Sequence, residues 1–140
     1  MASEVPHFID TKVLLYSISP HPEEEAKRAQ AEEVLKREDA ALSVQVLQEF
    51  YVQATRPTRA GRLPHDLAVG LIRTWCRFRV QTMTLAIVEA ALEIKAAHGF
   101  SYWDSAILAA ARALGCQTLY TEDMAHGRQV EGVIITNPFR

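Results

Sequence analysis

The stretch VPHFIDTKVLLYS, residues 5–17, decides the fold, because apolar residues crowd on both sides of a single aspartate. Phe8 and Ile9, followed by Val13 to Tyr16, are typical of a buried strand that runs into a loop or a short helix. Asp10 falls where that strand ends. We therefore expect a parallel sheet if further apolar strands alternate with helices along the chain.

Such an alternation continues to the end of the sequence. Strands are predicted over residues 41–46, 79–83, 116–121 and 132–136, and helices over residues 22–39, 47–56, 64–78, 85–98 and 101–115. Right-handed crossovers then give a parallel sheet with helices on both faces. The expected fold is α/β, a three-layer α/β/α architecture. At 140 residues the chain fits one domain over residues 1–140.

Composition excludes several classes of protein. Hydrophobic residues make up 49% of the chain and charged residues 23%, which argues against disorder and fibrous folds. A net charge of −2 gives no overall attraction to nucleic acid or acidic membranes. The arginine-rich stretch 56–79 is either a phosphate-binding surface or a set of ordinary solvated helix faces.

Cys76 and Cys116 lie outside any C-x-x-C motif, and no apolar run approaches the roughly 18 residues that span a bilayer. We expect a cytoplasmic protein with reduced thiols and no membrane association.

Four acidic residues are placed where they can meet. Asp10 and Asp123 each follow an apolar strand, and Glu49 and Asp104 lie near the starts of predicted helices. Taken singly, each is commonly a turn former, a helix cap or a solvated side chain. In parallel sheets, however, ligands gather beyond the carboxyl ends of the strands. Carboxylates crowded at that edge repel one another unless a cation neutralises them, and oxygen ligands without His or Cys favour Mg²⁺ or Mn²⁺ over zinc.

At these residues the chain resembles a PIN-domain ribonuclease, and more narrowly a VapC-type toxin of a toxin–antitoxin pair. The resemblance covers essentially the whole chain. It rests on an ordered set of short motifs: FIDTKVLLY with Asp10, VLQEFY with Glu49, YWDSAILAAA with Asp104, LYTEDM with Thr121 and Asp123, and the terminal ITNPF.

The resemblance implies a metal-dependent endoribonuclease. Asp10 and Asp104 are then the principal ligands of Mg²⁺, or of Mn²⁺, while Glu49 and Asp123 complete the site directly or through water. Thr121 is expected to line the same pocket. One or two ions could serve. The resemblance also implies an RNA substrate, a cognate antitoxin protein and a homodimer, with the helices over residues 23–37 and 64–78 as candidate partner surfaces.

Lys12 departs from the family pattern. The family usually has Asn or Ser two residues after the first aspartate, where this chain has Lys12. A lysine there could neutralise one carboxylate, contact the scissile phosphate or swing out to solvent. If it enters the pocket, we expect the affinity for metal to fall, and a catalytically impaired PIN-fold module that binds RNA or protein becomes the alternative function.

Other residues have simpler interpretations. His126 is expected to be a loop histidine that bonds its surroundings, with substrate contact as the alternative. Trp75 and Trp103 could stack on RNA bases, but both lie in apolar helical patterns, which favours core packing. A phospho-accepting signalling domain would share the parallel sheet, but it needs a late lysine after a strand, and no lysine follows Lys95.

Overall fold

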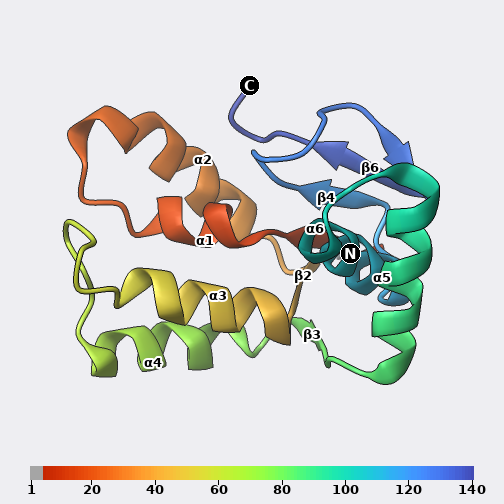
Figure 1. The fold of residues 1–140 in the computed structure, drawn as a ribbon. Coiled ribbons are helices and arrows are strands. Elements are labelled where there is room, and N and C mark those ends of the chain that lie inside the picture. Colours follow the sequence, from red (N-terminus) through yellow and green to blue (C-terminus); the bar gives the residue numbers. More distant parts are fainter. Residues whose placement is uncertain (1–4) are drawn as a thin grey trace.

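The fold is built around a six-stranded sheet, seen in the computed structural model that describes residues 5–140 (Figure 1). Residues 1–4, which the single-domain prediction includes, lie outside the described residues. The strands run in the order β3-β2-β1-β4-β6-β5, and every neighbouring pair is parallel except β5 with β6. Their bounds are β1 His7–Ile9, β2 Ala40–Ser43, β3 Arg79–Gln81, β4 Thr118–Tyr120, β5 Gln129–Val130 and β6 Val133–Thr136.

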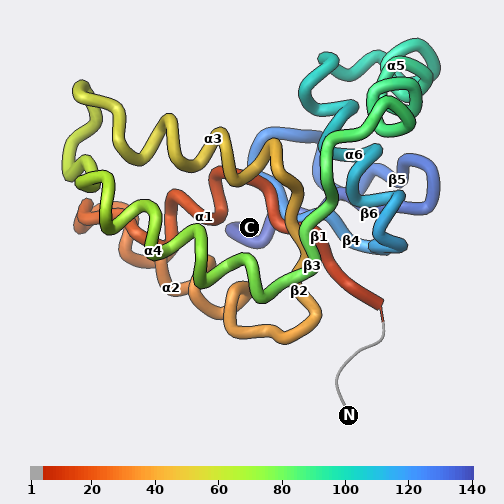
Figure 2. Tube along the Cα trace, turned by 90° about the horizontal axis from the view of Figure 1, so that it is seen from below, coloured from red at the N-terminus to blue at the C-terminus, as the bar shows by residue number. Residues whose placement is uncertain are grey.

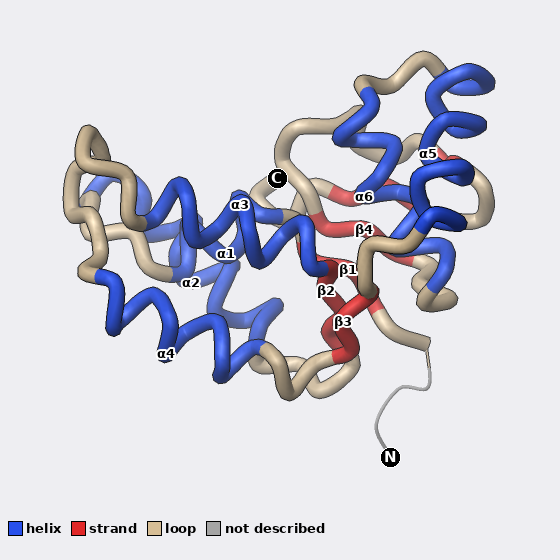
Figure 3. The backbone as a smooth tube through the Cα atoms, turned by 60° about the horizontal axis from the view of Figure 1, so that its bottom comes forward, coloured by secondary structure: helices blue, strands red, loops and turns tan. Residues whose placement is uncertain are grey.

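Within residues 5–140, six α-helices flank this sheet in two groups, which confirms the predicted α/β class. Helices α1 to α4 lie on one side of the strands, and α5 and α6 lie on the other (Figures 1, 2 and 3). Their bounds are α1 Thr11–Ser17, α2 Glu25–Leu35, α3 Val44–Ala54, α4 His65–Trp75, α5 Leu85–His98 and α6 Tyr102–Ala113, with a short 3₁₀ turn η1 at Pro22–Glu24.

The opening stretch takes the centre of the sheet, as its composition predicts. Strand β1 lies between β2 and β4, and Phe8 and Ile9 are fully buried. A parallel strand covered on both faces requires such a continuous apolar run. The strand ends at Ile9, and Asp10 begins α1 by accepting a hydrogen bond from the Thr11 amide. The central strand therefore delivers Asp10 to the carboxyl edge of the sheet.

Two predicted boundaries were wrong because a cap or a turn decides them. Strand β2 ends at Ser43 rather than Val46, since the Ser43 side chain accepts from the Val46 amide and starts α3 at Val44. Consequently Glu49 lies in the middle of α3 and not near its start. The helix predicted over residues 22–39 also ends early, at Leu35, and the Arg37 guanidinium beyond it pairs with Asp39 at 3.1 Å.

Strand β5 was not predicted. It has only two residues and no apolar run of its own, and it pairs antiparallel with β6 through a two-residue turn. Both turn residues, Glu131 and Gly132, have positive φ, at 52° and 86°. This conformation suits the twist of a tight hairpin. Within the described part of the chain, none of the helices has the length and apolar character needed to cross a membrane.

Candidate metal centre

Asp10 is held by hydrogen bonds to both of its carboxylate oxygens. Oδ1 accepts from the Thr11 amide at 2.7 Å, and Oδ2 accepts from the hydroxyl of the fully buried Thr121 at 2.8 Å. The Asp10 amide in turn donates to the carbonyl of Tyr120, at the end of β4. These bonds fix the Asp10 carboxylate at the junction of two neighbouring strands. Thr121 was expected to line the pocket, but it lies behind the lining: it is fully buried and contacts Asp10 without being one of the lining residues.

Burial makes the Asp10 carboxylate costly to ionise. Its pKa is raised to about 6, mainly by desolvation and in smaller part by the charges of Glu49 and Asp123. The hydrogen bonds from Thr121 and Thr11 act in the opposite direction and lower the pKa. None of its hydrogen-bond partners carries a positive charge. Within the described residues, Asp10 is therefore a buried acid whose carboxylate is hydrogen-bonded by neutral donors.

Glu49 reaches the same place from α3. Gln45, Glu49 and Gln53 are spaced four residues apart, so they share one face of the helix, and all three line the pocket that contains Asp10. The Glu49 carboxylate accepts from the Gln45 side-chain amide at 3.3 Å and from the Thr11 hydroxyl at 3.4 Å. Burial is the largest cause that raises the pKa of Glu49, and the charge of the nearby Asp104 raises it as well.

Asp104 is brought in by the start of α6. Ser101 caps this helix by accepting from the Asp104 amide at 3.1 Å, so Asp104 lies in the first turn rather than at the cap. Its side chain is partly buried. Burial is the largest cause that raises its pKa, and the charge of Asp123 raises it as well.

Asp123 differs from the other three acids because a lysine pairs with it. The Lys12 ammonium lies 2.9 Å from Asp123 Oδ1, with Lys12 and Asp123 side chains 47% and 46% exposed. The Asp123 amide donates to the Thr121 hydroxyl at 3.2 Å, which ties the loop after β4 back to the buried part of the site. Of the three orientations considered for Lys12, the structure has the one that neutralises a carboxylate.

The four acids line one pocket of about 110 Å³. They come from four separated segments: the ends of β1 and β4, the middle of α3 and the start of α6. Their donor set is entirely carboxylate oxygen, and the charges of the set raise the pKa values of Asp10, Glu49 and Asp104, so it suits a hard divalent cation. In residues 5–140, however, no three His, Cys, Asp or Glu side chains are arranged to hold a metal ion as they stand.

The pocket lining also includes six residues that were not among the predicted site residues: Thr11, Lys12, Gln45, Gln53, Trp103 and Ile107. Gln45 is buried, donates to Glu49 and also donates to the Trp103 carbonyl at 3.3 Å. Gln53 shares its helical face, and its four-residue spacing from Glu49 was the available signal. Trp103 lines the pocket while 63% exposed, so the prediction of core packing was wrong for it.

The remaining aromatic predictions are confirmed. Trp75 is buried and packs edge-on against Phe50, with ring centroids 4.7 Å apart. His126 bonds its own surroundings, because its Nδ1 accepts from the Asn137 amide at 2.9 Å. The pattern that predicts an apolar helix face therefore holds for α4, but the start of α6 projects beyond the core.

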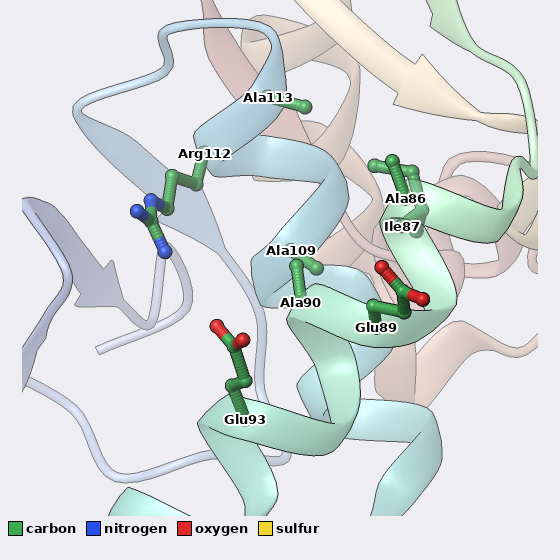
Figure 4. A pocket seen from close by; sticks show the side chains of 8 residues that line it. All are labelled: Ala86, Ile87, Glu89, Ala90, Glu93, Ala109, Arg112 and Ala113. Carbon is green, nitrogen blue, oxygen red and sulfur yellow. The ribbon is translucent and has the colours of Figure 1, made fainter.

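A larger cavity, of about 370 Å³, lies between α5 and α6 and away from the four acids. Figure 4 shows that its wall is formed mainly by small apolar side chains, with Glu89, Glu93 and Arg112 as its charged members. Arg112 is already paired with Glu131, at 3.1 Å. The two glutamates of this cavity both come from α5, whereas the acids of the smaller pocket come from four separate segments. The smaller pocket is therefore the candidate site.

A scan against protein-family models matched the PIN domain over residues 7–129. The chain belongs to the PIN-domain family. The matched region includes all four pocket acids, so the resemblance expected from the motifs is confirmed for the family. No curated protein sequence matched this PIN domain.

Solved structures similar to this PIN domain include several toxins. A toxin–antitoxin complex from Klebsiella pneumoniae matches with a TM-score of 0.70 and 17% identity, covering 94% of this chain and 97% of that one. VapC20 of Mycobacterium tuberculosis, a toxin that cleaves the sarcin-ricin loop, matches with a TM-score of 0.66 and 23% identity over 84% and 89% of the two chains. VapBC2 from Rickettsia felis, bound to promoter DNA, gives 0.66 and 17% over 95% and 98%. At these identities the likeness shows the fold alone, which this chain shares with VapC-type toxins.

Proposed function

We propose that this PIN domain is a Mg²⁺- or Mn²⁺-dependent endoribonuclease and the toxin of a type II toxin–antitoxin pair. The observation that carries the proposal is the convergence of Asp10, Glu49, Asp104 and Asp123 in one pocket. A structural role alone does not account for it, because burying mutually repelling carboxylates costs free energy that a cation offsets. The PIN family match and the toxin folds of similar structures support the same function.

Asp10 and Asp104 would be the principal ligands of the ion, with Glu49 and Asp123 completing the site directly or through water. The chemistry that a divalent ion supplies in such a site is activation of water at neutral pH and neutralisation of the charge on the scissile phosphate. Thr11 and Thr121 orient the Asp10 carboxylate through their hydrogen bonds. The hydroxyl of Thr121 is thus a positioning group for Asp10 and, through the Asp123 amide, for the loop after β4.

Proton transfer falls to the partly buried carboxylates. Glu49 and Asp104 line the pocket from α3 and α6, and in the absence of metal burial raises the pKa values of both. A carboxylate held at this position can accept a proton from water bound in the pocket. One of them accepts a proton from the attacking water. The water oxygen then forms a bond to phosphorus in line with the leaving oxygen, whose bond to phosphorus breaks and which takes a proton from solvent as it departs.

Trp103 is the residue best placed to contact RNA beside the cleaved bond. Its ring is largely exposed although the residue lines the acidic pocket, and its backbone is fixed by the Gln45 amide. Exposed aromatic rings bind unpaired bases by stacking. We therefore propose that Trp103 holds a base next to the scissile phosphate.

The partners follow from the same proposal. Helices α3 and α4 enclose an apolar groove of about 390 Å³, whose lining includes Leu47, Tyr51 and Ile72, and such a groove suits an apolar segment of a cognate antitoxin. Exposed leucines seven residues apart on α5, Leu85 and Leu92, offer a surface for a homodimer. Cytoplasmic action, where RNA and antitoxin would meet the toxin, completes the proposal.

RNA cleavage by the antitoxin-free protein tests the function. We expect structured RNA to be cut in Mg²⁺ or Mn²⁺, and we expect excess EDTA or the substitution Asp10→Asn to abolish the cutting. Asp66→Asn, an exposed aspartate in the first turn of α4, is the matched control and should cleave normally. Cleavage that persists in EDTA, or in Asp10→Asn, would show the metal mechanism to be wrong.

One observation favours a second candidate, a PIN-fold module that binds RNA or protein with impaired catalysis. The ion pair between Lys12 and Asp123 occupies one of the four pocket acids. The substitution Lys12→Asn separates the two candidates. A large gain in Mg²⁺-dependent cleavage would support an impaired native site, whereas a native protein that is already active and unchanged by the substitution would exclude the binding-only function.

A further inference from the structure

Lys12 is fixed in the acidic pocket by its place on α1. It is the second residue of that helix, two positions after Asp10, and its ammonium contacts two acids of the loop after β4. The shorter contact is with Asp123, at 2.9 Å, and the longer is with Glu122, at 3.7 Å. The charge that Lys12 brings into the pocket is therefore directed mainly at Asp123.

Glu122 does not compete for that charge, because other residues already hold it. The Tyr16 hydroxyl donates to Glu122 Oε1 at 2.6 Å, and the Lys27 ammonium binds Oε2. Lys27 also donates to the Tyr16 hydroxyl and lies over the Tyr16 ring. Tyr16 is one helical turn after Lys12 on α1, so this cluster holds the loop against the same face of α1 that presents Lys12.

The loop is also held from its other side. The Asp123 amide donates to Thr121, and Thr121 donates to Asp10, so the position of Asp123 relative to the buried acid is set by two hydrogen bonds. Lys12 and Asp123 thus face each other on anchored segments. Their ion pair therefore depends on two backbone segments that other contacts hold in place, unlike a contact between two freely moving surface side chains.

The balance of charge then limits how many cations the pocket can take. With Asp123 neutralised by Lys12, the free carboxylates are those of Asp10, Glu49 and Asp104. One divalent ion would leave these three carboxylates with a net negative charge of about one. A second would make it positive beside an ammonium group, and it would have to displace Lys12 from Asp123 to gain a ligand.

We propose that Lys12 takes the place of a second divalent cation, so that this PIN domain binds a single ion among Asp10, Glu49 and Asp104. This inference rests on the proposed function, because it concerns the metal of the same pocket. It assigns a role to Lys12, and it makes the number of bound ions depend on one side chain.

Counting bound Mn²⁺ ions tests the proposal without measuring activity. The full-length protein, free of antitoxin, is titrated with Mn²⁺, and the free ion is followed by electron paramagnetic resonance. We expect one ion per native chain and two per Lys12→Met chain. Lys12→Arg should stay at one because it keeps the charge, and the double variant Lys12→Met/Asp123→Asn should return to one because the ligand freed by the first change is lost.

Lys36→Met is the matched control. It removes the same charge from a lysine that is 72% exposed and does not line the pocket, and it should leave one ion bound. Two ions on the native chain, or one ion on Lys12→Met, would overturn the inference while leaving chelator-sensitive RNA cleavage, and hence the proposed function, intact. No Mn²⁺ on either protein would overturn the inference and the metal-dependent function together.

Discussion

Asp10 and Asp123 hold similar positions in the sequence but different positions in the chemistry of the pocket. Each follows an apolar strand, and the two strands, β1 and β4, are neighbours in the sheet. Yet Asp10 is buried and bonded only to neutral donors, whereas the Asp123 side chain is 46% exposed and paired with Lys12. The strand ends determine where both carboxylates lie. Lys12, which reaches Asp123 from α1, determines which of the two carboxylates is free for a metal ion.

The largest expected effect separates these two acids in catalysis. Asp10→Asn removes the acid that Lys12 does not neutralise, and we expect RNA cleavage to be lost, a fall of at least roughly 10²–10⁴-fold to the background rate. Asp123→Asn removes an acid that Lys12 already neutralises, and we expect a smaller loss, of about tenfold. Initial rates on one structured RNA measure both. Equal losses would mean that the two acids do not differ in the way proposed.

The stability of the metal-free protein should distinguish them next. Because the pKa of Asp10 is raised to about 6 in the folded protein, the folded state keeps a proton that the unfolded state has lost. The contribution of Asp10 is therefore most favourable below about pH 4, is lost as the pH rises to about 6, and stays lost above that. Asp10→Asn should stabilise the protein at pH 7 by about 2–3 kcal/mol.

Urea unfolding with chelator present, at several pH values, measures this effect. Asp123→Asn serves as the comparison and should show no such gain, because its carboxylate is half exposed and has a cation beside it. A metal-free native protein whose stability does not fall between about pH 4 and pH 6 relative to Asp10→Asn would contradict the burial of a poorly compensated charge at Asp10.

The supporting residues should follow the same division. Thr121→Val removes a buried donor to Asp10 and should lower the free energy of unfolding by about 1–3 kcal/mol. Lys12→Met removes a half-exposed ion pair and should change it by less than about 1 kcal/mol. Thermal or urea unfolding of both variants at one pH provides the test. A larger loss of unfolding free energy for Lys12→Met than for Thr121→Val would mean that the contacts of Asp123, and not those of Asp10, stabilise the site.

The smallest expected effect concerns the edge of the pocket. Trp103→Ala should weaken RNA binding by about 1 kcal/mol, because it removes an exposed stacking surface, while Trp103→Phe should largely retain it. Binding of a non-cleaved RNA to an Asp10→Asn background isolates this term from catalysis. The buried Trp75 is no guide here, since its replacement would disturb the core around Phe50. Unchanged binding by Trp103→Ala would remove this residue from the proposed RNA surface.

Much of the fold could be predicted because buried parallel strands are written as apolar runs. The runs at residues 5–17, 116–121 and 132–136 gave the central strands, and their ends gave the edge at which Asp10 and Asp123 lie. Helix α5 was predicted with its observed bounds, and Gly99 ends it in the left-handed conformation at φ 78°. Strand β5 could not be found in this way, because its pairing depends on the turn at Glu131 and Gly132 rather than on an apolar run.

The pocket itself was harder to predict than the acids that form it. Helical periodicity indicates which residues share a face, but it does not say what that face contacts. Hence Gln45 was not identified as a partner of Glu49, and Trp103 was assigned to the core although it is exposed. Lys12 pairs with Asp123, which lies in the loop after β4, more than one hundred residues away in sequence. Local sequence around Lys12 therefore could not identify its partner.

The central claim is that the pocket of Asp10, Glu49, Asp104 and Asp123 binds a divalent cation. Thermal unfolding of the native protein and of Asp104→Asn, with and without Mn²⁺, tests it most directly. We predict that Mn²⁺ at a hundred times its Kd stabilises the native protein by about 2.7 kcal/mol and leaves Asp104→Asn unchanged. Superimposable unfolding curves for the native protein with and without Mn²⁺ would contradict the claim.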